Sequence, residues 1–149
     1  EWISNLLDNR PDLSPAKLQR TRQLMNDAVP DCLVDDYETV YVALAKELEL
    51  PDDNDRHVLA AAVRCGAEAI VTFNLKDFPA HLLAARQIEP LHPDIFIHRH
   101  FALAEVAVVR AAARCRSRLQ APMLSTEQYL LVLEKCGLQQ TVARLREIF

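Results

Sequence analysis

The chain has 149 residues, of which 50% are hydrophobic and 26% are charged, and its formal net charge at pH 7 is −4. This composition is typical of a globular protein with an ordinary core, and it excludes a disordered chain. The two glycines, Gly66 and Gly137, are too far apart for a phosphate-binding loop, a dinucleotide-binding turn or a nucleophile elbow. No apolar run approaches the roughly 18 residues of a membrane span, so we expect no membrane association.

The charge is unevenly distributed along the chain. Residues 1–93 carry 9 Lys and Arg against 16 Asp and Glu, whereas residues 94–149 carry 8 against 5. The front is therefore acidic and the tail is basic. The four cysteines are scattered and form no C-x-x-C pair, which predicts reduced core residues in a cytoplasmic protein rather than disulfides or a zinc site.

The first third of the chain predicts mainly helices. The opening run EWISNLLDNR is already helical in character at Glu1, and we expect the true N-terminus to lie upstream. A serine followed by a proline predicts a helix start and a helix over 15–28. Residues 32–34 could form a short buried strand, and a helix is the favoured interpretation of residues 37–50.

The middle of the chain alternates between helical and strand patterns. Residues 57–65 predict an apolar, buried helix that ends at Gly66, a natural residue for a helix C-terminus. Residues 69–73 predict a strand buried on both faces, residues 74–79 predict a loop before another helix, and residues 87–91 predict a final strand. Helices that alternate with apolar strands indicate a parallel α/β sheet.

The last third predicts helices alone. One long helix covers residues 94–119, and Ser125 with Gln128 three positions later predicts a capping box at the start of another. We therefore expect two regions, an α/β domain over residues 1–93 and an all-helical extension over residues 94–149.

The stretch PDDNDRH at 51–57 places three aspartates before the buried helix. Asp52 and Asp53 can cap this helix, or they can be secondary site residues that act as outer-sphere charges. Asp55 instead shares a helix face with apolar residues three, four and seven positions later. A carboxylate on the core side needs compensation, which a cation supplies far better than the helix N-terminus does.

The predicted topology brings further oxygen ligands to this carboxylate. In a parallel sheet, helix N-termini and strand C-termini share one edge, so Asp55 should meet Asn74 and Asp77, which follow the strand. Such oxygen ligands suit Mg²⁺ or Mn²⁺, and a metal held there would support phosphodiester hydrolysis. The alternative from the residues alone is that these aspartates only cap helices, with Asp77 capping the helix that follows it.

The run LPDDNDRHVLAAAVRCGAEAIVTFNLKDFP resembles the C-terminal half of a PIN domain, the nuclease fold of VapC-type toxins. The basic helical tail resembles the extension of a subfamily of longer VapC toxins. The resemblance implies a parallel-sheet α/β/α sandwich in which three or four acidic residues bind Mg²⁺ or Mn²⁺. It also implies RNA cleavage, a cognate antitoxin and a homodimer.

The residues that match the family's acidic positions are Glu1, Asp55 and Asp77, the last accompanied by Asn74. The family's first aspartate lies on an opening strand, which we expect upstream of this chain, so the chain by itself should be inactive or impaired. The leading hypothesis is therefore a metal-dependent endoribonuclease that is the toxin of a toxin–antitoxin pair. The competing hypothesis is a non-catalytic, truncated remnant that dimerises or binds a partner, and a DNA-directed nuclease is left open.

Several basic residues are secondary candidates for substrate binding. Arg56 and His57 could touch phosphate or transfer protons, although pairing of Arg56 with the neighbouring aspartates is the favoured alternative. Lys76 could bind phosphate as a point charge or remain solvated. A basic stripe on the predicted tail helix could follow an RNA backbone or simply face solvent. The residues of this stripe are Arg110, Arg114 and Arg118.

Overall fold

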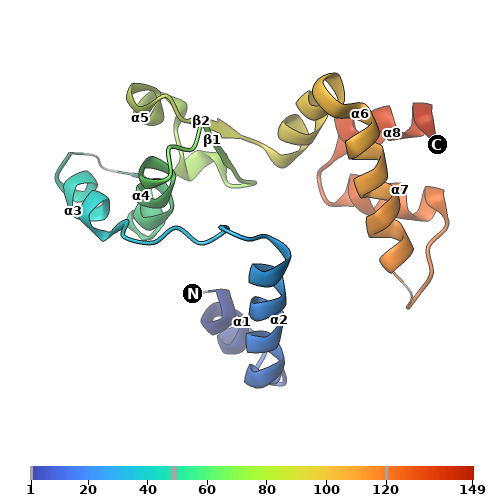
Figure 1. Ribbon diagram of the computed structural model, residues 1–149, viewed down its shortest axis with the longest axis horizontal. Helices are drawn as coiled ribbons and strands as arrows, with labels where there is room; N and C mark the ends of the chain where they lie inside the picture. Colours follow the sequence, from blue (N-terminus) through green and yellow to red (C-terminus); the bar gives the residue numbers. More distant parts are fainter. Residues whose placement is uncertain (1, 48–49, 120) are drawn as a thin grey trace.

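The protein is described here from a computed structural model, in which residues 2–47, 50–119 and 121–149 are defined. Figure 1 shows three groups of elements: the pair α1–α2, a middle part from α3 to β2, and a helical extension from α6 to α8. The helices are α1 (Trp2–Asn9), α2 (Pro15–Ala28), α3 (Glu38–Glu47), α4 (Arg56–Arg64), α5 (Ala80–Leu83), α6 (Pro93–Arg118), α7 (Thr126–Lys135) and α8 (Gln139–Ile148). The strands are β1 (Ala69–Val71) and β2 (Glu89–Leu91), and the 3-10 turns are η1 (Asp53–Asp55), η2 (Leu75–Asp77) and η3 (Ala84–Arg86).

The pair α1–α2 contributes little to the core, because no residue of either helix is buried. Helix α2 begins at Pro15 and ends at Ala28, which confirms the predicted bounds. Its N-cap residue Ser14 has extended backbone angles, but its side chain makes no capping hydrogen bond. Pro15 and the fixed φ of proline thus account for the helix start without help from the serine hydroxyl.

The predicted strand at 32–34 is wrong. This segment is irregular in the structure, and Leu33 is 64% exposed. Asp31 and Asp36 on either side have positive φ angles of 63° and 59°. Left-handed residues turn the chain sharply. Residues 32–34 therefore form an irregular connection between α2 and α3 and do not pair as a strand.

A first hydrophobic core lies between α3, α4 and the small sheet. Helix α4 buries Leu59, Ala60 and Ala62, and of its nine residues only Arg64 is exposed, which confirms the predicted buried helix in the main. The helix packs on α3 and β1. The predicted end of the helix is confirmed, because Gly66 follows with a positive φ of 66°.

Strands β1 and β2 pair in parallel, with Ala69 opposite Glu89 and Val71 opposite Leu91. The predicted parallel α/β arrangement is confirmed for these two strands. The predicted burial of the first strand on both faces is wrong, because Ile70 is buried whereas Val71 is 43% exposed and Phe73 beyond it is 62% exposed. Side chains of a strand alternate between faces, and the face that carries Val71 is not covered by the described elements.

A second hydrophobic core holds the helical extension together. Phe101, Leu130, Val142 and Leu145 form its buried centre. Helix α6 bends at Ala104, whose φ and ψ of −155° and 55° lie outside the helical region. The predicted capping box at the start of α7 is confirmed, since the Ser125 hydroxyl accepts the Gln128 N–H and the Gln128 side chain accepts the Ser125 N–H.

The middle part and the helical extension meet at His92. Its Nδ1 accepts the Asp94 N–H at 3.2 Å and so caps α6. The ring also lies edge-on to Phe73, with centroids 5.0 Å apart. Gly137 lies near this pair, and an added Cβ would be 3.5 Å from the Phe73 ring, an ordinary van der Waals distance. The φ of 85° at the backbone turn after α7 is therefore what favours glycine here.

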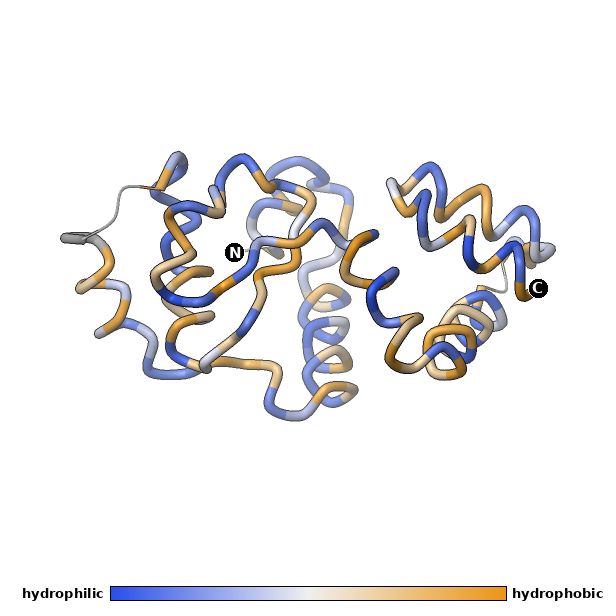
Figure 2. The backbone as a smooth tube through the Cα atoms, turned by 90° about the horizontal axis from the view of Figure 1, so that it is seen from above, coloured by the Kyte–Doolittle hydropathy of each residue, from blue (hydrophilic) through white to orange (hydrophobic). Residues whose placement is uncertain are grey.

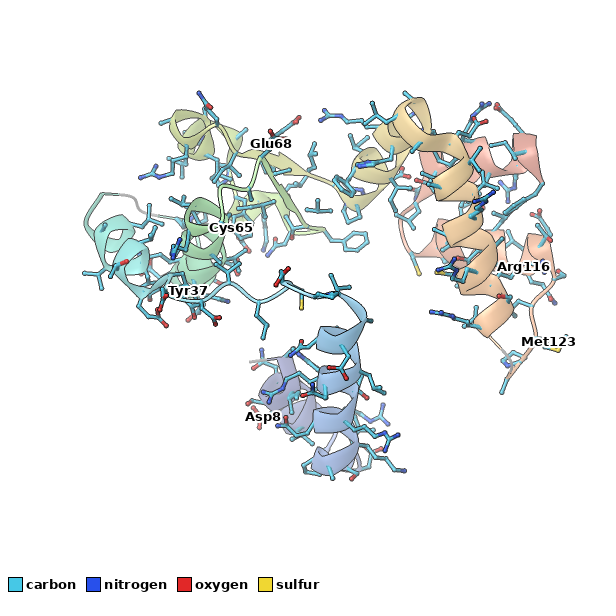
Figure 3. The ribbon with its side chains drawn as sticks, viewed as in Figure 1. Asp8, Tyr37, Cys65, Glu68, Arg116 and Met123 are labelled. Carbon is cyan, nitrogen blue, oxygen red and sulfur yellow. The ribbon has the colours of Figure 1, made fainter. Side chains whose placement is uncertain are left out.

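Two sequence-based expectations concern the surface. The four cysteines are free, and the prediction that they lie in the core is wrong, because all four are exposed: Cys32, Cys65, Cys115 and Cys136. Cys65, for example, lies at the C-terminal end of α4 (Figure 3). Hydrophilic and hydrophobic residues alternate along the helices (Figure 2). No helix in the described ranges has the length and apolar character needed to cross a membrane.

Candidate metal centre

Three carboxylates converge at the edge of the middle part. One oxygen from each of Asp52, Asp55 and Asp77 lies within 4.8 Å of the others. The first two come from the turn before α4 and the third from the turn after β1, so they are joined by the tertiary fold. We call this set the acidic cluster. Its geometry is compatible with a divalent metal ion.

The turn η1 explains why Asp52 and Asp55 point the same way. Asp52 is its N-cap, and its carboxylate accepts the Asn54 N–H at 2.9 Å. Side chains three residues apart are eclipsed in a 3-10 turn, so Asp55 lies on the same side as Asp52. Asp55 occupies the N-cap position of α4, yet its side chain makes no capping hydrogen bond there. Asp52 therefore acts as a helix cap, as the alternative interpretation predicts, whereas the Asp55 side chain does not cap α4.

Asp77 is positioned from the other side by the turn η2. It is 9% exposed, and its Oδ2 accepts a hydrogen bond from the side-chain amide of Asn74. The N–H of Asn74 is in turn held by the Thr72 hydroxyl at 3.0 Å. The alternative that Asp77 caps the next helix is wrong, because α5 has Pro79 at its N-cap and no side-chain capping bond.

The carboxylates of the acidic cluster repel one another when they are ionised, and a bound cation would reduce this repulsion. At an effective dielectric constant of about 20, two unit charges 4.8 Å apart repel by about 3.5 kcal/mol. The cluster opens onto a polar hollow of about 660 Å³, lined by Asp52, Asn54, Asp55 and Asn5 from α1. Oxygen-rich, water-accessible surroundings of this kind suit a hard cation that keeps part of its hydration shell.

The remaining acidic and basic candidates around α4 lie beside the cluster. Asp53 points to solvent with its side chain 74% exposed, and it pairs with Arg56. The guanidinium of Arg56 also lies 5.9 Å from the Tyr41 ring centroid. This pairing is the favoured alternative of the sequence analysis. His57 Nδ1 contacts the Asn54 carbonyl at 2.6 Å, whereas Lys76 is exposed on η2.

Other predicted site residues are not brought to the cluster. Glu1 lies outside the described residues. The arginine stripe of Arg110, Arg114 and Arg118 lies on α6 in the helical extension, a different part of the molecule (Figure 1). The structure thus unites Asp55, Asp77 and Asn74 as predicted, and it adds Asp52 as a full member. The D-x-x-D spacing of Asp52 and Asp55 could have indicated that both belong to the cluster. This spacing places two side chains on the same side only in a 3-10 turn, which the sequence analysis did not predict.

Asp94 is the most buried carboxylate of the helical extension, and it was not among the predicted site residues. It is 4% exposed, and its two oxygens accept the N–H groups of Gln140 at 2.9 Å and Thr141 at 2.8 Å. Burial would raise the pKa of Asp94, but these backbone hydrogen bonds outweigh burial and hold the pKa below its ordinary value. The residue connects the first turn of α6 to the start of α8 and is structural.

Comparison with known proteins places the chain near one family. Residues 93–147 match the family described as the VapC50 C-terminal domain. A protein of Mycobacterium tuberculosis named "Putative ribonuclease VapC50" is 65% identical over 43 residues, which are 29% of this chain and 25% of that protein. The aligned part thus spans a quarter of this relative. No solved structure matches the chain. The first two findings confirm the predicted likeness of this chain to VapC-type toxins.

Proposed function

We propose that the protein containing this chain is a metal-dependent endoribonuclease, the toxin of a toxin–antitoxin pair. The observation that carries the proposal is the convergence of Asp52, Asp55 and Asp77 within 4.8 Å. The name of the similar protein, which describes a ribonuclease, supports RNA as the substrate class. The proposal includes a PIN-like sandwich over residues 1–93 and a helical extension over residues 94–149.

The donor set fits Mg²⁺ or Mn²⁺. Three carboxylates offer only oxygen ligands, and no cysteine or histidine takes part in the group. When bound, such an ion would activate water and neutralise the scissile phosphate. Asp55 and Asp77 are the proposed principal ligands, and Asp52 and Asn74 complete or orient the set. Glu1, which lies outside the described residues, is included because the resemblance to VapC-type toxins matches it to an acidic position of that family.

The neighbouring residues have positioning roles in this proposal. Asn74 holds the Asp77 carboxylate by its amide, which leaves the other oxygen of Asp77 for a ligand. Lys76 is exposed next to this turn and can neutralise a substrate phosphate. Arg56 is committed to Asp53, so we assign it to shaping the turn rather than to the substrate. A cognate antitoxin and a homodimer are the partners that the likeness to VapC-type toxins supports.

The test combines metal binding with RNA cleavage. Calorimetry with Mn²⁺ on this chain should give binding that Asp55→Asn and Asp77→Asn weaken by more than about 100-fold, because even an outer-shell partner is worth 10- to 100-fold. Cleavage of a single-stranded RNA by the full-length protein should fall in parallel. The matched control is Glu68→Gln, which removes an equal charge at an exposed position outside the acidic cluster. Undiminished Mn²⁺ binding and cleavage in the Asp55→Asn protein would exclude the proposed site.

A further inference from the structure

The helical extension has an apolar groove along α6. The groove has a volume of about 390 Å³ and is lined by side chains of α6, α7 and α8, including Phe96, Ala107, Ala111, Tyr129, Leu133 and Leu145. Ala107 and Ala111 are exposed, so the floor of the groove is open to solvent. Half-open apolar surfaces of this size are typical binding sites rather than ordinary surface.

A second hollow continues the groove on the far side of α6. The same alanines, Ala104, Ala107 and Ala111, line both hollows. The second is also lined by Arg110, Arg114 and Glu105, of which Glu105 is paired with Arg144. Arg110 and Arg114 are four residues apart and therefore stand on one side of the helix, about 6 Å apart along its axis. The groove thus has an apolar floor and one positively charged rim.

The acidic residues of the extension are paired with groups other than the rim arginines Arg110 and Arg114. Arg144 pairs with Glu105 and Glu147, and Arg146 pairs with Glu127 and Glu134. The fifth carboxylate, Asp94, is bonded to backbone N–H groups. Within the described residues, Arg110, Arg114 and Arg118 have no ion pair. Every carboxylate of the extension is therefore engaged, and the exposed rim arginines are available to carboxylates of another molecule.

We propose that this groove binds an amphipathic helix of a protein partner, with carboxylates beside its apolar face. A partner helix would lie along α6 from Ala104 to Arg118, a length of about 21 Å or four turns. Its apolar residues would cover the alanine floor, and Asp or Glu residues four apart would face Arg110 and Arg114. The inference does not depend on the nuclease proposal, because no residue of the acidic cluster lies in the groove.

Two other occupants fit the groove less well. RNA phosphates would suit the arginines, but ribose and phosphate gain nothing from an alanine and leucine floor and lose hydration there. A second copy would offer α2, whose exposed Leu24 and Met25 are accompanied by Arg20 and Arg22, and these charges repel the rim. The acidic helix α3 of such a copy already packs Val40, Tyr41 and Leu44 in its own first core. Charge complementarity therefore favours an acidic helix.

The experiment uses the whole chain and two synthetic helical peptides of 16 residues. Both carry the same leucine face; one has glutamates beside it and the other has lysines. By fluorescence anisotropy the acidic peptide should bind at least about tenfold more tightly than the basic one, since like charges oppose binding. The double variant Arg110→Glu/Arg114→Glu should invert this preference, whereas the matched control Arg20→Glu/Arg22→Glu on α2 should not change it.

Further variants separate the groove from the alternatives. Ala107→Trp should abolish binding of the acidic peptide by filling the floor, and circular dichroism should show an intact fold because the position is exposed. Asp55→Asn should bind the peptide normally, even if the nuclease proposal fails. Equal binding of both peptides, or binding of neither, would overturn the inference. It is also overturned by dimerisation that Ala107→Trp disrupts, or by RNA binding that requires Arg110 and Arg114 but not Ala107.

Discussion

The middle part and the helical extension treat their carboxylates in opposite ways. In the extension, Glu105, Glu127, Glu134 and Glu147 each face an arginine, and Asp94 accepts two backbone N–H groups. In the middle part, three carboxylates approach one another within 4.8 Å. The first arrangement stabilises a helical bundle by local neutralisation. The second accumulates negative charge, which a bound cation would offset.

The cavities of the two parts show the same contrast. The hollow next to the acidic cluster is lined by Asp and Asn side chains, whereas the groove in the extension is lined by alanines, leucines and aromatic residues. A polar hollow suits ions and phosphates, and an apolar groove suits a protein helix. These linings agree with the two proposals, a metal centre in the middle part and a helix-binding groove in the extension.

The largest expected effect tests whether the two cores are independent. Leu59 in the first core and Leu145 in the second are both fully buried, and each truncation to alanine should cost about 2–5 kcal/mol. Leu145→Ala should increase amide exchange in the extension and leave Mn²⁺ binding unchanged. Leu59→Ala should increase amide exchange in the middle part, weaken Mn²⁺ binding and leave the extension protected. Hydrogen exchange and calorimetry measure both outcomes. If either variant exposed all amides together, the division into two parts would be wrong.

The next effect tests the acidic cluster by ligand-linked stability. A ligand that binds only the folded state at 100 times its Kd stabilises that state by about 2.7 kcal/mol. Mn²⁺ at that concentration should therefore raise the Tm of the wild type. Asp77→Asn should lose this gain, while Asp94→Asn, which alters a carboxylate of the other part, should keep it. An equal gain in the Asp77→Asn protein would place the metal elsewhere.

Asp94 gives a pH-dependent test of the extension. Its native pKa is lowered, so its contribution to stability is present above the unfolded pKa of about 3.9 and is lost as the pH falls through the lower native pKa. Asp94→Asn should cost about 1.5–3 kcal/mol at neutral pH, as expected for hydrogen bonds to a charged group. The difference from wild type in chemical denaturation should stay constant above about pH 5 and shrink below about pH 4. A difference that did not change with pH would show that the charge of Asp94 is not what holds α8.

The smallest effect compares two helix starts. Ser125 accepts the Gln128 N–H in a complete capping box, whereas Ser14 makes no side-chain capping bond. Ser125→Ala should therefore destabilise the extension by about 1 kcal/mol, and Ser14→Ala should change stability by much less. Thermal unfolding of the two single variants measures the difference. Equal losses would mean that the serines act through backbone propensity rather than through the hydrogen bond.

Features with local causes were predictable from the sequence. The bounds of α2, the capping box at Ser125 and the helix end at Gly66 all depend on residues a few positions apart. The parallel pairing of β1 with β2 followed from the alternation of helices and apolar runs. The convergence of Asp55 with Asp77 followed in turn from the edge that such a sheet shares with its helices.

Burial was predicted less well, because hydrophobicity shows which residues can be buried but not which neighbours cover them. Val71 has the same apolar character as Ile70, yet it is 43% exposed. The predicted burial of the four cysteines was wrong for the same reason, whereas the strand predicted at 32–34 was wrong because Asp31 and Asp36 turn the chain. Asp94 is the converse case, a charged residue that is buried because two N–H groups from α8 meet it.

The sequence alone therefore predicted most of the helices, the parallel pairing of the two strands, the convergence of Asp55 with Asp77 and the likeness to VapC-type toxins. These properties depend on residue type and short spacing. The tertiary structure alone decided that Asp52 joins the cluster, that the rim arginines remain unpaired in the described chain, and that α6 borders an open groove. Those properties depend on distances between segments far apart in the chain, which the packing of the elements sets.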